Sequence, residues 1–235
     1  KKVKTSGLDG SSFQLTINQK PLTINLPIPG IYHIYDAVAA IATAHHLNLP
    51  IHRYTDILKN FQPAFGRVEK LPFGFIFLIK NPAGATQVFE TIAPQIKPED
   101  RLLIALNDNL ADGTDVSWIW DADFEKLLPN IRHKKAQKSA GVNMIPPQGW
   151  TFEVVVSGTR AADLAVRLKY AGFEPKRLIV QPDLKKALKQ ARTGLKSLPA
   201  GRQGQLFILP TYTALLELQR ILTKQGIKPH YWQEN

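Results

Sequence analysis

Residues 106–121, LNDNLADGTDVSWIWD, place four carboxylates and two tryptophans within sixteen positions. A carboxylate beside an indole ring loses part of its hydration, which raises its pKa unless a cation or a hydrogen-bond donor keeps it ionised. A histidine is a partner that would do so. The stretch therefore predicts an ionised acid that is presented to a basic group.

Two of these four acids are expected to have structural roles. Asp108 stands between two asparagines directly after an apolar segment, where short Asx side chains cap backbone donors or fix a turn. Asp112 lies in the turn sequence ADG. Asp115 and Asp121 differ because they bracket the aromatic segment VSWIW. These two acids are therefore the candidates for chemistry.

The tryptophans of this segment are candidates for a docking surface. Alternation predicts that Val116, Trp118 and Trp120 pack on one side. Aromatic side chains are enriched at interface hot spots, so Trp118 and Trp120 suit a partner interface. Core packing is the alternative for at least one of them.

Five short, nearly continuous apolar runs predict strands that are buried on both faces. They lie at 75–79, 101–106, 153–157, 177–180 and 205–210. Helical patterns follow at 87–93, 122–128, 160–171, 183–193 and 211–225. This alternation predicts an α/β fold, a mostly parallel Rossmann-like sheet with helices on both faces. Ligands of such sheets bind at the carboxyl ends of strands, and the acidic stretch begins at one of these ends.

The chain before these strands has another pattern. FQLTINQKPLTINLP predicts a hairpin with Lys20 and Pro21 in its turn, because apolar and polar residues alternate on either side. An alanine-rich helix is expected from Tyr32, and a second helix over 51–61. This opening segment is too small and too one-sided to be a complete domain.

Two stretches fit the alternation poorly. Residues 129–150 are basic and then rich in proline and glycine, and residues 197–205 are similar. Both are expected to be surface insertions. A functional loop is the alternative for the first.

Composition excludes several classes of protein. With 235 residues, of which 44% are hydrophobic and 21% charged, the chain can bury a core and is not disordered. No apolar run is long enough to span a bilayer. The absence of cysteine excludes disulfides and thiolate zinc sites and fits a reducing, cytoplasmic location.

The net charge of +11 favours anionic partners such as phosphorylated ligands, an acidic membrane surface or nucleic acid. No basic run is interleaved with stacking aromatics, so nucleic-acid binding is not expected. A chain of this charge is also compatible with action at the inner surface of a membrane.

Several segments resemble the Mur ligase family. GIYHIYDAVAAIATAHHLNLP followed by FGRVEKL resembles the end of the Mur central domain and its junction with the third domain. IKNPAGATQVFE, LNDNLADGTDVSWIWDADFE, VVSGTRAADLAVRLKYAG and LPTYTALLELQ resemble the C-terminal domain of the MurT type. The resemblance implies that residues 1–66 are the incomplete end of a central domain and that residues 67–235 are a C-terminal domain.

The resemblance also implies a function. MurT-type proteins are subunits of lipid II isoglutaminyl synthase, which uses ATP and Mg²⁺ to amidate the D-glutamate α-carboxyl of the peptidoglycan stem peptide. A GatD-type glutamine amidotransferase is the partner that supplies ammonia. In this family an aspartate of the MurT subunit is thought to complete the partner's Cys-His triad across the interface, where it would orient the histidine.

Asp121 is our first candidate for that aspartate, because it closes the aromatic segment and precedes the helix expected at ADFEKLL. Asp115 is the second candidate. The alternative for Asp121 is a helix N-cap that accepts from the amide of Asp123 or Phe124.

The chain departs from the family where nucleotide would bind. No phosphate loop G-x-x-x-x-G-K-[ST] occurs in the chain, so it is not expected to hydrolyse ATP alone. Arg67 matches the junction arginine that lies near nucleotide in the family, with an interdomain ion pair to Glu69 or another acid as the alternative. Lys80 and Asn81 replace an acidic motif, and Lys80 is a candidate phosphate contact or a plain surface lysine.

Two classes of function follow. The first is an amide-ligase subunit that docks an amidotransferase and completes its triad. The second is a non-enzymatic Mur-fold module that binds a partner protein or an anionic ligand.

Overall fold

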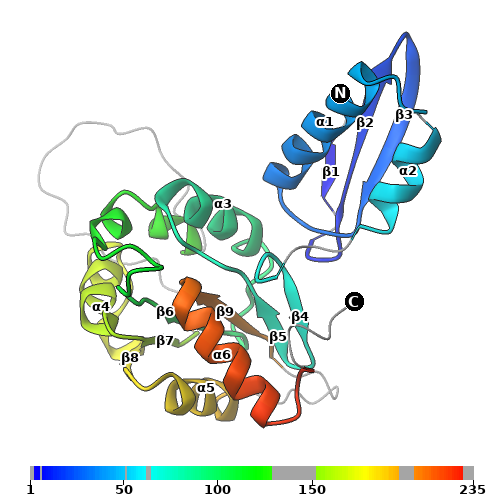
Figure 1. Ribbon diagram of the computed structural model, residues 1–235. Helices are drawn as coiled ribbons and strands as arrows, with labels where there is room; N and C mark the ends of the chain where they lie inside the picture. The colour runs from blue at the N-terminus through cyan, green and yellow to red at the C-terminus, as the bar shows by residue number, and fades with distance from the viewer. Residues whose placement is uncertain are drawn as a thin grey trace, which may run out of the picture.

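The computed structural model describes residues 3–5, 7–50, 52–61, 65–128, 152–195 and 204–229 (Figure 1). The insertion expected at 129–150 and nearly all of that at 197–205 lie outside the described residues. No helix in the described ranges is long and apolar enough to cross a membrane.

Two sheets make up the described fold. The first is antiparallel, in the order β1 (Val3–Thr5), β2 (Ser11–Ile17) and β3 (Lys20–Leu26). The second has six strands in the order β4-β5-β9-β6-β7-β8. Its strands are β4 (Glu69–Leu71), β5 (Gly74–Ile76), β6 (Arg101–Ala105), β7 (Val154–Ser157), β8 (Leu178–Val180) and β9 (Leu206–Pro210). No strand is shared, which is consistent with our proposed division at residue 67.

The first sheet carries helices α1 (Ile31–His46) and α2 (His52–Lys59) (Figure 1). The expected hairpin is present, but its turn was misplaced. Asn18 and Gln19 have φ angles of 48° and 65°, as a two-residue hairpin turn requires, and Lys20 and Pro21 are already in β3. The prediction failed because Lys20-Pro21 was read as a breaker, although proline is tolerated on an edge strand.

The second sheet confirms the predicted fold class. All its neighbouring strands are parallel except β4 and β5, and β4 escaped prediction because its sequence EKL forms no apolar run. Alternate residues of β6 enter different cores: Leu102 and Ile104 face α3 (Pro82–Ile92) and α4 (Ala161–Tyr170), and Leu103 and Ala105 face α5 (Leu184–Thr193) and α6 (Tyr212–Lys224). Burial on both faces explains the continuous apolar runs.

Helix α3 begins five residues before its predicted start. Asn81 is its N-cap and accepts a hydrogen bond from the Gly84 amide at 2.7 Å, with Pro82 in the first helical position. The prediction did not take the pair Asn81-Pro82 into account. The same pair is a favoured helix start, because the cap satisfies a free amide and proline needs none.

The helix predicted over 122–128 is only a short 3₁₀ helix, η2 (Phe124–Leu127), and a second 3₁₀ helix, η1 (Ser117–Trp120), precedes it. Three residues per turn direct Val116, Ile119 and Ala122 into the core. The prediction that Val116, Trp118 and Trp120 share one side was therefore wrong. Trp118 packs at the edge of the core, whereas Trp120 is 52% exposed.

Candidate functional site

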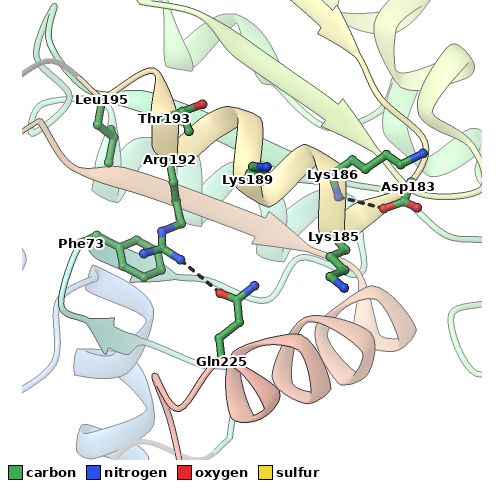
Figure 2. A pocket seen from close by; sticks show the side chains of 9 residues that line it. All are labelled: Phe73, Asp183, Lys185, Lys186, Lys189, Arg192, Thr193, Leu195 and Gln225. Atoms are coloured by element: carbon green, nitrogen blue, oxygen red, sulfur yellow. Dashed lines mark hydrogen bonds between the residues drawn. The ribbon is translucent and has the colours of Figure 1, made fainter.

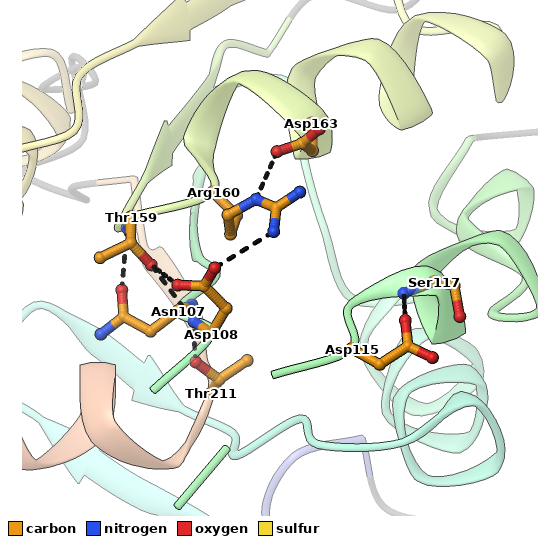
Figure 3. Close-up of polar contacts among 8 residues, drawn as sticks. All are labelled: Asn107, Asp108, Asp115, Ser117, Thr159, Arg160, Asp163 and Thr211. Atoms are coloured by element: carbon orange, nitrogen blue, oxygen red, sulfur yellow. Dashed lines mark hydrogen bonds and ion pairs between the residues drawn. The ribbon is translucent and has the colours of Figure 1, made fainter. Parts of the chain in front are cut away.

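The candidate site lies at the carboxyl ends of β9, β6 and β7, which are adjacent in the sheet. Polar residues follow each of these strands, and Figure 3 shows most of them converging. The segment 106–128 then leaves this edge and passes through η1 and η2 toward α4. The site thus has two parts, a polar network at the strand edge and an outer face on η1.

Asn107 is the centre of the network and is 5% exposed. Its backbone amide donates to Thr211 Oγ1 at 3.0 Å, and its side-chain amide donates to Thr213 Oγ1 at 2.9 Å. Its Oδ1 accepts from the Thr159 amide at 3.0 Å. One side chain therefore holds together the segments that follow β6, β7 and β9.

Asp108 belongs to the same network. It accepts from Thr159 Oγ1 at 2.8 Å and from Arg160 at 3.1 Å, and these hydrogen bonds hold its pKa below the usual range. Arg160 also donates to Asp163 at 2.6 Å (Figure 3). The close approach depends on Gly158, whose φ is +94° and where a Cβ would lie 2.3 Å from the Leu106 carbonyl oxygen. The structural role predicted for Asp108 agrees with these contacts.

Asp112 caps helix α6. Its carboxylate accepts from the Thr213 amide at 2.8 Å and from the hydroxyl of the same residue. Thr211, the N-cap residue of α6, makes no such bond through its side chain, because its hydroxyl accepts from the Asn107 amide. Asp112 is therefore part of the scaffold, as predicted.

Asp115 stands apart from the network (Figure 3). One of its carboxylate oxygens accepts from the Ser117 amide at 2.8 Å, and this bond lowers the pKa of Asp115. The side chain is exposed. Asp115 thus shapes the start of η1 and keeps one oxygen for solvent.

Among the four acids of 106–121, Asp121 is the one whose side chain forms no hydrogen bond or ion pair with the described residues. It is exposed at the C-terminus of η1, where its amide donates to the Trp118 carbonyl at 3.1 Å. The N-cap of η2 is Asp123, so Asp121 does not serve as that cap. Its side chain is exposed to solvent.

Arg167, on α4, positions the segment around Asp121, a role that no sequence pattern indicated. Its side chain is buried, with 5% of the residue exposed. It donates to the carbonyl oxygens of Ile119 at 2.9 Å and Ala122 at 2.8 Å, which flank Asp121. It also binds both oxygens of Glu125 at 2.9 Å. One guanidinium therefore fixes η1 and η2 against α4 and leaves Asp121 free.

Trp120 lies over this guanidinium, with the Arg167 carbon 5.7 Å from its ring centroid. Its ring is 5.8 Å from that of Tyr170, which is 72% exposed. Val166, one turn before Tyr170 on α4, is also exposed. These side chains form an aromatic face beside Asp121, of which the sequence analysis named only Trp120.

The other candidate residues lie at the start of the second sheet. Arg67 and Lys80 are exposed, and Asn81 caps α3. The ion pair considered between Arg67 and Glu69 is not formed, because Glu69 binds Lys228, Gln219 and the Gly66 amide. The structure thus leaves Arg67 and Lys80 available to an anion and gives Asn81 a structural role.

Arg67 is near the first turn of α1. Burial raises the pKa of Tyr32 to about 12, and the positive charge of Arg67 opposes this rise. Burial also lowers the pKa of His33, so its imidazole is neutral, and its Nε2 has no partner in the described part of the chain. No group of three or more His, Asp or Glu side chains that could hold a metal ion occurs in the described ranges.

Comparison with known proteins identifies relatives. The profile of the family MurT ligase C-terminal matches residues 78–215. The chain is 32% identical over 223 residues to subunit MurT of lipid II isoglutaminyl synthase (glutamine-hydrolyzing) from Streptococcus pneumoniae, covering 91% of the chain and 44% of that protein. It is 31% identical over 227 residues to the same subunit from Staphylococcus aureus, covering 95% and 45%. The chain spans less than half the length of these relatives.

Solved structures with the same fold include folylpolyglutamate synthase from Mycobacterium tuberculosis complexed with ADP, with a TM-score of 0.63 and 19% identity, covering 94% of this chain and 46% of that one. UDP-N-acetylmuramate-alanine ligase MurC from Thermotoga maritima has a TM-score of 0.61 and 15% identity, with coverage of 96% and 45%. At these identities the likeness concerns the fold alone.

Proposed function

The chain belongs to the MurT ligase C-terminal family, and from this membership we propose that it acts as part of a MurT-type subunit of lipid II isoglutaminyl synthase. In this role it would dock a GatD-type glutamine amidotransferase through the face formed by η1 and α4. It would also present Asp121 to the catalytic histidine of that partner. The complete enzyme would amidate the D-glutamate α-carboxyl of the stem peptide on lipid II, in the cytoplasm and at the inner membrane surface.

The observation that carries this proposal is the contrast among the four acids of 106–121. Asp108, Asp112 and Asp115 each accept hydrogen bonds from their own chain, whereas Asp121 has no side-chain partner in the described residues and is exposed beside Trp120. A triad acid must keep a free oxygen to accept the Nδ1–H of histidine. Asp121 meets this requirement, and Asp115 meets it with one oxygen only.

Arg167 gives that acid a fixed position. It binds the carbonyls on either side of Asp121, so the backbone is held while the carboxylate stays open to a partner. A carboxylate held in this way would fix the tautomer of the histidine and stabilise imidazolium while the cysteine attacks glutamine. The exposed ring of Trp120 would bury apolar area against the partner beside this contact.

ATP and Mg²⁺ would supply the activation of the substrate carboxyl in the complete enzyme. Arg67 and Lys80 are exposed cations and would bind a phosphate group of ATP. Asn81 caps α3, so it would contribute to phosphate binding through the N-terminus of that helix. The chain contains no phosphate loop, and its described part offers no cluster of metal ligands. The remaining contacts to nucleotide and Mg²⁺ would come from outside these residues.

Glutaminase turnover of a GatD-type amidotransferase, measured with and without this chain, tests the proposal. We expect turnover to rise when the chain is added and to saturate at equimolar concentration. Unchanged turnover together with stable binding would favour the second function, a Mur-fold module that binds a partner without completing its triad.

A further inference from the structure

A cavity in the described part of the chain lies away from the candidate site. It has a volume of about 680 Å³ and lies between α5 and the end of α6, far along the chain from the acidic stretch (Figure 2). Four of its lining residues are cations of α5, and we refer to it as the α5 groove. They are Lys185, Lys186, Lys189 and Arg192.

These cations have no carboxylate partners in the described part of the chain. The one acid of the groove, Asp183, caps α5 by accepting from the Lys186 amide at 2.8 Å. Elsewhere in this unit, cations such as Arg101, Arg160 and Lys228 form ion pairs. The positive charge of the α5 groove is therefore left to solvent or to a ligand.

The placement of these cations destabilises α5 when no ligand is bound. Lys185 and Lys186 stand in the first turn, where the helix dipole disfavours positive charge, and Lys185 and Lys189 repel each other at the i, i+4 spacing. Helix α4 follows the favourable rule, with Asp163 in its first turn and Arg167 and Lys169 in its last. A bound anion would relieve both unfavourable effects in α5.

Arg192 closes one end of the groove and is held in place. Its guanidinium carbon lies 4.3 Å from the centroid of the Phe73 ring, and one of its nitrogens donates to Gln225 Oε1 at 3.1 Å (Figure 2). Its other donors have no partner among the described residues and would be available to an oxyanion. Phe73 and Leu195 give this end an apolar wall.

We propose that the α5 groove binds a diphosphate or polyphosphate group. Along the axis of an α-helix, Lys189 lies about 6 Å from Lys185, and Arg192 lies about 10 Å from Lys185. This spacing of positive charges matches a row of phosphates better than a single phosphate. The cavity also exceeds the size of one phosphate and leaves room for an organic group against Phe73. This proposal does not depend on the proposed function.

The test is calorimetric titration of the chain with sodium pyrophosphate at constant ionic strength, because salt screens such contacts. Lys185→Gln together with Lys189→Gln should weaken binding at least about tenfold, since this change removes two charge-assisted contacts. Lys59→Gln together with Lys169→Gln is the matched control, because these exposed lysines lie outside the groove. The control should change the Kd less than about twofold, since its lysines make none of these contacts.

A second arm separates the two sources of such a group. Co-sedimentation with phosphatidylcholine vesicles that contain an isoprenyl diphosphate lipid, against plain phosphatidylcholine vesicles, tests a lipid headgroup. Selective loss in the Lys185/Lys189 variant with either pyrophosphate or vesicles supports the proposal and names the source. Absence of saturable binding to both probes, or equal weakening in both double variants, overturns it.

Discussion

The two parts of segment 106–121 contain the same kinds of residue and use them in opposite ways. At the strand edge, Asn107, Asp108 and Asp112 bind groups of the chain itself. On η1, Trp120 and Asp121 face solvent. Density of acids therefore does not identify a functional carboxylate, whereas the presence or absence of internal hydrogen bonds separates the scaffold from the presented group.

The first prediction concerns the presented acid and has the largest expected effect. Asp121→Asn keeps the shape of the side chain but removes the charge that would stabilise imidazolium. In serine proteases the equivalent change lowers kcat about 10⁴-fold, and we expect a loss of at least about 10²-fold in glutaminase turnover of the complex. The assay is ammonia release at saturating chain concentration.

Asp115→Asn is the matched control, since Asp115 uses one oxygen to hold the Ser117 amide. It should leave most of the turnover. If Asp115→Asn abolishes turnover and Asp121→Asn does not, the two acids exchange roles. If neither variant has an effect, the segment has a structural role only, and the result supports the second function, a Mur-fold module that binds a partner without completing its triad.

A second prediction concerns the residue that holds η1. Arg167→Met should lower the free energy of unfolding by about 3 kcal/mol, because it leaves the Ile119 and Ala122 carbonyls and Glu125 without their donor. Urea denaturation followed by circular dichroism measures this loss. Arg167→Lys should restore only part of the lost stability, since an ammonium cannot reproduce the planar set of hydrogen bonds that the guanidinium makes. Stability equal to that of the unchanged chain would show that η1 does not depend on Arg167.

A third prediction concerns the strand-edge network. Asn107→Ala should destabilise the chain by about 2 kcal/mol, because it removes two side-chain hydrogen bonds at a buried site. Asp121→Ala should stay within about 0.5 kcal/mol, as exposed substitutions usually do. If thermal denaturation shows the same loss of stability in both variants, the distinction between the strand-edge network and the exposed face of η1 is wrong.

A fourth prediction separates the two tryptophans. Trp120→Ala should raise the Kd for the amidotransferase about tenfold, and Trp118→Ala should instead lower stability, because Trp118 packs against the core. Calorimetry of the complex and thermal denaturation of the chain measure the two effects. Equal affinity of the Trp120→Ala variant would exclude η1 from the interface.

Much of this arrangement could be predicted from the sequence, and the exceptions have physical causes. Strands buried on both faces produce apolar runs that the chain shows clearly, so the five parallel strands were found. The orientation of Trp120 was missed because a single 3₁₀ turn has a period of three, which four residues hardly distinguish from alternation. The role of Arg167 was missed because its partners are backbone carbonyls 45 and 48 residues away, which leave no local pattern.

The smallest expected effect is a pH dependence that distinguishes Glu125 from Asp121. Burial raises the pKa of Glu125, but the hydrogen bonds from Arg167 outweigh it, so the folded-state pKa is lower than usual. A lowered carboxyl pKa stabilises the fold above the unfolded value of about 4.3, and this contribution is lost as the pH falls below it.

The difference in Tm between the unchanged chain and Glu125→Gln should therefore be larger at pH 7 than at pH 3. Because the side chain of Glu125 is 36% exposed, salt should reduce this difference. Asp121→Asn should show no such change, since Asp121 has no partner in the described residues whose loss would depend on its charge. If Asp121→Asn shows the same pH-dependent difference, its carboxylate is bound within the chain, and it is not free to receive a histidine from a partner.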